Sequence, residues 1–163
     1  FGPAVVEASG SITSSRFFVI HVATIIAALA AILLSGFYGA IYLVLWRQLR
    51  TKRFGLLYHR LPDLESLSGL NRGAATVGFL LMTVGLNLGI WWAHDARISG
   101  FRYTDPKLLC IFGLWIVFGL IGASRWLHVL SGRRAALLAV MGLLLVLASF
   151  LLSVLAVGFH AFS

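Results

Sequence analysis

Three of the five histidines in this chain stand at the ends of long apolar segments. His21 lies near the start of the first segment, His94 follows the second, and His160 follows the last. Imidazole is a common axial ligand of haem iron, and two histidines from different helices can coordinate the iron from both sides. These residue types favour a haem site, with His21 and His160 as the iron-ligating pair. A zinc site is less favoured, because no local Cys/His ligand spacing occurs.

The same histidines also have a purely structural interpretation. A histidine at a membrane boundary can reach toward the headgroup region, or it can complete a packed helix end. For one histidine taken alone, this interpretation is the favoured one. For His21, His94 and His160 together, on one predicted face, packing and a cofactor site are about equally supported.

The segment between the second and third apolar stretches, HDARISGFRYTDPK, carries further candidate groups. Arg97 and Arg102 could pair with haem propionates, because a guanidinium binds a carboxylate through two parallel hydrogen bonds. Phe101 and Tyr103 could lie against a porphyrin edge. Aromatic and charged residues also anchor membrane proteins at the interface. On residue types alone, the anchor is slightly favoured.

Four long apolar segments must position these residues. They cover residues 17–46, 73–93, 108–130 and 135–159. Each is long enough to cross a hydrocarbon core, which needs about 20 apolar residues. Hydrophobic residues make up 60% of the chain and charged residues only 11%, a composition that argues against a soluble domain of this size. We therefore predict an all-α polytopic membrane protein, with residues 1–163 as one domain and four transmembrane helices in one bundle.

The net charge of +8 does not indicate a nucleic-acid partner, because the basic residues lie between the apolar segments. The segment between the first and second stretches, taken as residues 47–72, holds six of them. Arg133 and Arg134 precede the last stretch, and the C-terminal tail has no charged side chain. The positive-inside rule predicts that both termini lie outside and that these two basic connections are cytoplasmic.

Small residues predict the inward faces of the helices, because they let helices approach closely in lipid. In the first segment, small residues recur every four positions and form a stripe that consists of Ala23, Ala27, Ala31, Ser35 and Gly39. A seam in the fourth consists of Ala135, Ala139, Gly142, Ser149, Ser153, Ala156 and His160. In the second, Thr76, Thr83, Asn87 and His94 share a face, and Asn87 is deep enough to require a hydrogen-bond partner.

The chain also resembles a known family. The similarity runs from HVATIIAALAAILLSGFYGAIYLVLWRQLRTK through LPDLESLSGLNRGAATVGFLLMTVGLNLGIWWA. It continues with DPK at 105–107, RWLH ending at His128, and GFHAF around His160. These blocks resemble the cytochrome c assembly family of haem-handling membrane proteins, with its Ccs-type and HemX-like members.

The resemblance implies roles for particular residues. His21 and His160 match two external histidines that ligate haem, and His128 matches a histidine linked to haem entry near the cytoplasmic side. The loop with Arg97 and Arg102 matches the tryptophan-rich haem platform of the family. That platform is eroded here, because Arg97 and Thr104 occupy tryptophan positions. The family also has further N-terminal spans that do not occur in these 163 residues.

These observations predict a membrane protein that binds or moves haem, b-type and held transiently, for cytochrome c assembly. Two other hypotheses remain open: a non-catalytic structural subunit of a respiratory or photosynthetic complex, and a b-type electron-transfer subunit. No nucleophile–base pair, phosphate loop or carboxylate dyad is present, so we expect no independent catalysis. Expected partners are the lipid bilayer, other membrane subunits, and apocytochrome c or a haem-handling subunit. The expected location is a bacterial inner membrane or a plastid-type energy-transducing membrane.

Overall fold

The computed structural model describes the backbone of residues 16–52, 62–95, 106–127 and 130–160. It describes the side chains of the same residues except 17, 93–95, 106–108 and 152–160. These residues form the helices α2 (Arg16–Arg50), α3 (Leu64–Asp95), α4 (Pro106–Leu127) and α5 (Gly132–His160). All four are long and apolar enough to cross a membrane, which confirms the predicted all-helical membrane architecture.

Side-chain caps explain where two of the helices begin. The amide of Ser66 donates to Oδ2 of Asp63 at 3.4 Å, and this bond satisfies one of the free amides at the start of α3. The amide of Arg134 donates to Oγ of Ser131 at 3.4 Å at the start of α5. The capped helix α3 therefore begins at Leu64, well before the apolar segment that we predicted from residue 73.

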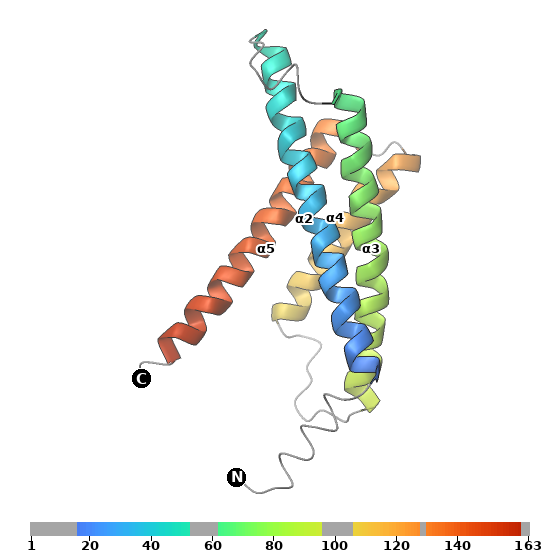
Figure 1. The fold of residues 1–163 in the computed structure, drawn as a ribbon, viewed down its shortest axis with the longest axis vertical. Coiled ribbons are helices and arrows are strands. Elements are labelled where there is room, and N and C mark those ends of the chain that lie inside the picture. Colours follow the sequence, from blue (N-terminus) through green and yellow to red (C-terminus); the bar gives the residue numbers. More distant parts are fainter. Residues whose placement is uncertain (1–15, 53–61, 96–105, 128–129, 161–163) are drawn as a thin grey trace, which may run out of the picture.

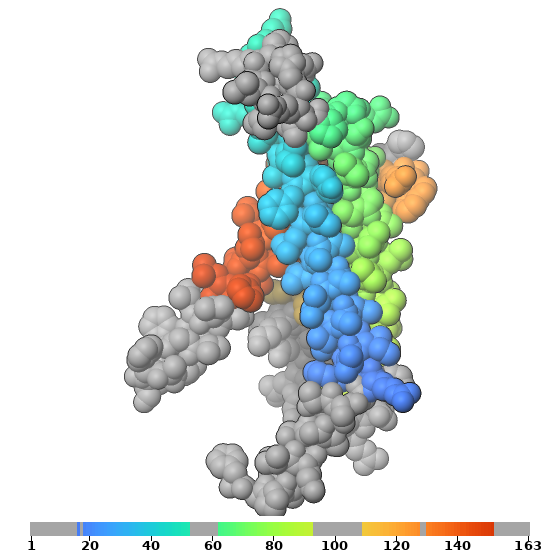
Figure 2. Space-filling view, in the orientation of Figure 1, coloured from blue at the N-terminus to red at the C-terminus, as the bar shows by residue number. Residues whose placement is uncertain are grey.

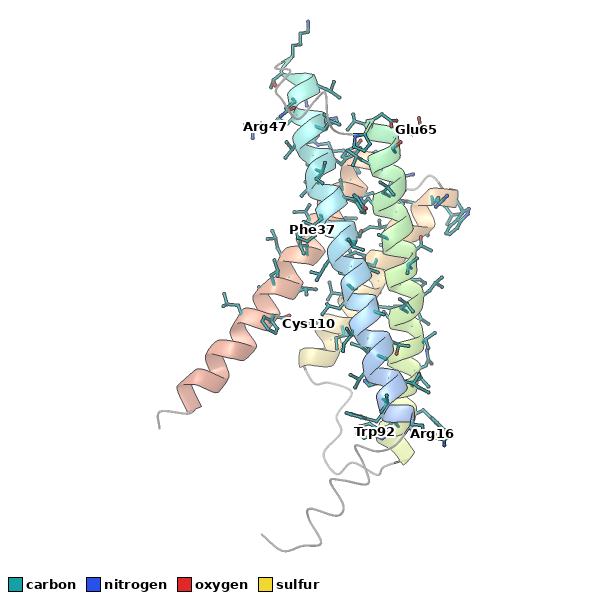
Figure 3. All side chains as sticks on the ribbon, viewed as in Figure 1. Arg16, Phe37, Arg47, Glu65, Trp92 and Cys110 are labelled. Atoms are coloured by element: carbon teal, nitrogen blue, oxygen red, sulfur yellow. The ribbon has the colours of Figure 1, made fainter. Side chains whose placement is uncertain are left out.

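The helices α2 and α3 run side by side along the length of the bundle (Figures 1 and 2). The described parts of the two connections predicted to be basic lie at one end, which we call the basic end. Figure 3 shows Arg47 and Glu65 at this end, and Arg16 and Trp92 at the other. We call the other end the histidine end, because α2 carries His21 there. The fold thus places His21 and the described basic residues Arg47 and Arg50 at opposite ends of α2.

The core lies where all four helices meet, and it contains both large and small side chains. Ile32 of α2, Phe118 and Ile121 of α4, and Ala135 and Ala139 of α5 are all fully buried. A Cβ atom at Gly142 would lie 2.7 Å from Cε2 of Phe118, so α5 reaches α4 this closely only with glycine there. The prediction of small residues at this part of α5 is confirmed.

The structure corrects the predicted face of α2. Ala31, Ser35 and Gly39 are buried as expected, but Ala23 and Ala27 are exposed. A four-residue step turns an α-helix by about 400°, so a strict four-residue stripe drifts by about 40° at each step. Near the histidine end, the face toward α3 instead contains His21, Ile25 and Ala28.

The predicted seam of α5 is wrong at Ser149, and its last three members, Ser153, Ala156 and His160, have side chains outside the described part of the chain. Ser149 is exposed, and so are the apolar side chains of Leu144, Leu147 and Phe150 around it. Figure 1 shows the reason, because α5 diverges from the other three helices toward its C-terminal end. Among the seam residues whose side chains are described, those near the basic end, Ala135, Ala139 and Gly142, are buried, and Ser149 is not.

Candidate functional site

His21 is held between α2 and α3 by one hydrogen bond. Its Nδ1 atom lies 2.7 Å from the carbonyl oxygen of Gly85, and the ring is partly buried. A carbonyl oxygen can only accept, so Nδ1 must carry the proton in this pair. The neutral imidazole then keeps its lone pair on Nε2. That atom is the one that can bind a metal, and a backbone carbonyl on the other nitrogen is a common support for metal-ligating histidines.

Two glycines of α3 make room for this arrangement. A Cβ atom at Gly89 would lie 2.6 Å from Cε1 of His21 and 2.9 Å from Nδ1, so no side chain fits at this position while the ring stays in place. A Cβ atom at Gly85 would lie 2.5 Å from Cδ1 of Ile25. The backbone of α3 therefore lies directly against the imidazole ring, with no side chain between them. The two glycines, one helical turn apart, were the sequence signal that could have revealed it.

An aromatic pair joins α2 to α3 at the histidine end, one helical turn from His21 and Gly89. The rings of Phe18 and Trp92 are 5.2 Å apart between centroids, with 48° between their planes. Phe18 lies one turn before His21 on α2, and Trp92 lies one turn after Gly89 on α3. The hydroxyl of Thr24 donates to the carbonyl oxygen of His21 at 2.8 Å, which fixes the local backbone further. The histidine end therefore combines a fixed imidazole with an aromatic pair one helical turn away along each helix.

The other candidate residues are described less fully. His94 lies in the last turn of α3 and His160 is the last residue of α5, but their side chains lie outside the described part of the chain. His128, Arg97 and Arg102 lie entirely outside the described residues, as does His59. Among the residues that the structure describes, no cluster of three or more His, Cys, Asp or Glu side chains could hold a metal ion.

The proposed iron-ligating pair therefore remains a prediction. The start of α2 carries His21, and Figure 1 shows the end of α5 standing apart from it. The exposed side chains of Leu144 and Leu147 agree with this divergence. A shared iron between His21 and His160 would require the outer half of α5 to approach α2.

The polar groups of α3 and α4 have structural partners instead, and the structure corrects the inward face predicted for Asn87, whose side chain is exposed. Nδ2 of Asn87 donates to the carbonyl oxygen of Thr83 at 2.7 Å, so the expected partner of Asn87 is its own helix. The indole nitrogen of Trp115 donates to Oγ1 of Thr83 at 2.8 Å and joins α4 to α3. We assign the Trp115–Thr83 bond to helix packing and the Asn87 bond to α3 alone.

Comparison with known proteins relates all four helices to one protein family. The model of a family described as "Cytochrome C assembly protein" matches residues 6–160, a range that includes His21, His128 and His160. The cytochrome c biogenesis protein CcsA of Prochlorococcus marinus (strain MIT 9303) is 30% identical over 174 residues, which cover 91% of this chain and 54% of that protein.

Other relatives carry the same description. CcsA of Synechococcus sp. (strain CC9902) is 31% identical, over 91% of this chain and 56% of that protein. CcsA of Parasynechococcus marenigrum (strain WH8102) is 35% identical over 104 residues, which are 63% of this chain and 34% of that protein. The chain thus spans about half the length of the first two relatives. No solved structure matches it with significance.

Proposed function

The chain belongs to the cytochrome c assembly family, and on this premise we propose that it binds haem in the membrane and handles it for cytochrome c assembly. The single observation that carries the proposal is the His21–Gly85 hydrogen bond, which leaves Nε2 as the free nitrogen of a fixed imidazole. The family match supplies the class of cargo, and the geometry of His21 suits that cargo.

The donor set of the histidine end fits haem. A neutral imidazole is a common axial ligand of haem iron, and the aromatic pair of Phe18 and Trp92 offers apolar surface one helical turn away. We propose His21 and His160 as the ligands on the two sides of the iron. Haem would then be cargo, held through its iron by the two imidazoles.

The remaining proposed roles follow the resemblance of the chain to its family. Arg97 and Arg102 would pair with the propionates, because guanidinium groups bind carboxylates through two hydrogen bonds. His128 would contact haem near the basic end, where cargo enters. We further propose that the basic end faces the cytoplasm and that both termini lie outside. Membrane subunits of the same assembly machinery and apocytochrome c are the proposed partners.

The two other hypotheses have no observation in their favour. A purely structural subunit would not need the ring of His21 to be fixed against Gly85 and Gly89. A b-type electron-transfer subunit would need a pair of iron ligands within the bundle. The buried polar side chains among the described residues are Ser35, Asn71 and Ser124, and none of them is an iron ligand.

The proposal is tested by the absorption spectrum of the protein purified with haem, with and without reductant. We expect a Soret band that Gly89→Ala shifts or weakens, because the new Cβ atom would lie 2.6 Å from Cε1 of His21 and displace the ring. The matched control is Gly113→Ala, since a Cβ atom there meets nothing within 4 Å. An identical spectrum for wild type and both variants would remove the support that His21 lends to haem handling.

A further inference from the structure

A separate cleft opens at the basic end, far along the bundle from His21. Its volume is about 370 Å³, which is room for roughly ten water-sized groups. All four helices contribute to its lining, which consists of Tyr42, Leu64, Glu65, Ser68, Gly69, Arg72, Arg125 and Gly132. The proposed handling of haem at the histidine end uses none of these residues.

Two guanidinium groups share this cleft. Nη2 of Arg72 donates to the carbonyl oxygen of Leu130 at 3.0 Å, and Nη1 donates to that of Ser124 at 3.4 Å, while its Nε atom is buried and makes no hydrogen bond. Arg125 reaches across to α3, where its Nη1 atom lies 3.9 Å from the Cβ position of Gly73. Neither arginine forms an ion pair within the part of the chain that the structure describes. Two positive charges that share a cleft at a membrane boundary repel each other, and a bound anion would stabilise both.

Hydroxyl groups and a helix N-terminus complete the cleft. Tyr42 is only 9% exposed, and its hydroxyl has no hydrogen-bond partner among the described residues. The first residue of α5 is Gly132, and a Cβ atom there would lie 2.7 Å from the Tyr42 hydroxyl and 3.2 Å from Oγ of Ser68. Glycine thus brings the two hydroxyls against the start of a 29-residue helix. The first amides of a helix lack partners within it and favour negative charge.

We infer that this cleft binds a phosphate group. Arg72 and Arg125 supply the charge, Tyr42 and Ser68 supply neutral donors, and the amides of Gly132 and Arg133, which precede the capped amide of Arg134, complete the donor set. Glu65 lies at the same cleft and is exposed, so its carboxylate opposes the anion and limits the affinity. A phosphate suits this arrangement because it accepts hydrogen bonds on several oxygens at once.

The surroundings favour a phospholipid as the source of the phosphate. An apolar groove of about 230 Å³ lies between α3 and α4, lined by Thr76, Phe79, Leu80, Gly119, Gly122, Ala123, Trp126 and Leu127. It starts one helical turn beyond Arg72 on α3, since the hydroxyl of Thr76 donates to the carbonyl oxygen of Arg72 at 2.8 Å. A lipid with its headgroup in the cleft would thus have an apolar groove one helical turn away on α3 for an acyl chain. Inorganic phosphate has the same headgroup chemistry but would leave the groove unused.

The test measures ligand binding to the purified chain in a neutral detergent. Phosphatidylglycerol retention is followed by native mass spectrometry, and stabilisation by inorganic phosphate is followed against chloride at equal ionic strength. We expect Arg125→Gln to weaken binding about tenfold, the usual effect of losing one charge-assisted hydrogen bond. Tyr42→Phe should weaken it less, and Glu65→Gln should strengthen it.

Arg134→Gln is the matched control, because it removes one exposed basic charge at the same end but does not line the cleft. Binding of the lipid alone, lost in Arg125→Gln and kept in Arg134→Gln, would identify a phospholipid headgroup. Stabilisation by inorganic phosphate with the same dependence on Arg125 would identify free phosphate in the same cleft. Equal losses in the two arginine variants, or no binding of either probe, would overturn the inference.

Discussion

The Nδ1 atom of His21 on α2 lies 2.7 Å from the carbonyl oxygen of Gly85 on α3. This bond joins two helices whose residues are 64 positions apart in the chain, and it selects the imidazole tautomer that leaves Nε2 as acceptor. The oxygen of Gly85 belongs to the backbone of a helix, so its position is as rigid as α3 itself. A ligand that binds Nε2 therefore meets a nitrogen whose direction is set before binding.

The contact between α5 and α4 predicts opposite effects for two glycine substitutions. Gly142→Ala should destabilise the protein by about 1–3 kcal/mol, because its Cβ atom would lie 2.7 Å from Cε2 of Phe118 in a packed core. Gly113→Ala should stabilise it by about 0.5–1 kcal/mol, because the position is open and alanine favours helix. Unfolding in mixed detergent micelles measures both. Equal effects of the same sign would show that α5 does not pack on α4 in this way.

A buried polar pair links α2 to α3 nearer the basic end. Oγ of Ser35 donates to Oδ1 of Asn71 at 2.7 Å, and the two side chains are 0% and 1% exposed. Ser35→Ala should cost about 1 kcal/mol, because it leaves the Asn71 amide without this bond in an apolar interior. In the double variant with Asn71→Leu, the loss should be smaller than the sum of the single losses. Strict additivity in the same unfolding measurement would mean that the pair is not coupled.

The stability of the first turn of α3 should depend on pH. The hydroxyl and then the backbone amide of Ser66 hold the pKa of the Asp63 carboxyl below its ordinary value. A lowered pKa in the folded state means that this cap stabilises at neutral pH and is lost as the pH falls below about 4. Hydrogen exchange of the first amides of α3 should be slower in wild type than in Asp63→Ala at pH 6. The difference should shrink toward pH 2.5, and equal exchange already at pH 6 would argue against the cap.

The proposed orientation predicts labelling from opposite sides of the membrane. In a Cys110→Ser background, a cysteine at Ser66 should react only from the cytoplasmic side of sealed vesicles, and one at Ser163 only from the outside. A membrane-impermeant maleimide distinguishes the two sides. Reaction of both cysteines from the same side would rule out the proposed topology.

The sequence predicted the class of fold well, because four apolar segments of this length have few alternatives to membrane-spanning helices. It placed the start of α3 wrongly, since the first turns of that helix are too polar to stand out by hydropathy. Arg72 was counted as part of a loop, yet it lies in α3 and donates to the carbonyl oxygens of Ser124 and Leu130.

The partner of His21 could not be predicted from residue types. A backbone carbonyl has no sequence signature, and the crossing of α2 over α3 decides which glycine lies under the ring. The strict four-residue stripe failed at Ala23 and Ala27 for a related reason, because helix faces follow a period of about 3.6 residues. The positions of single polar groups thus depend on how the helices pack, which the pattern of residue types does not specify.

The most direct test of the haem proposal is the Soret band of protein loaded with haem and compared among histidine variants. His21→Ala should shift the band or lose haem, because the substitution removes the imidazole that Gly85 holds in place. His160→Ala should do the same if it supplies the second ligand, whereas His59→Ala should leave the band unchanged and His94→Ala should affect it less. A His21→Ala spectrum identical to that of wild type, or wild-type protein that takes up no haem, would contradict the proposal.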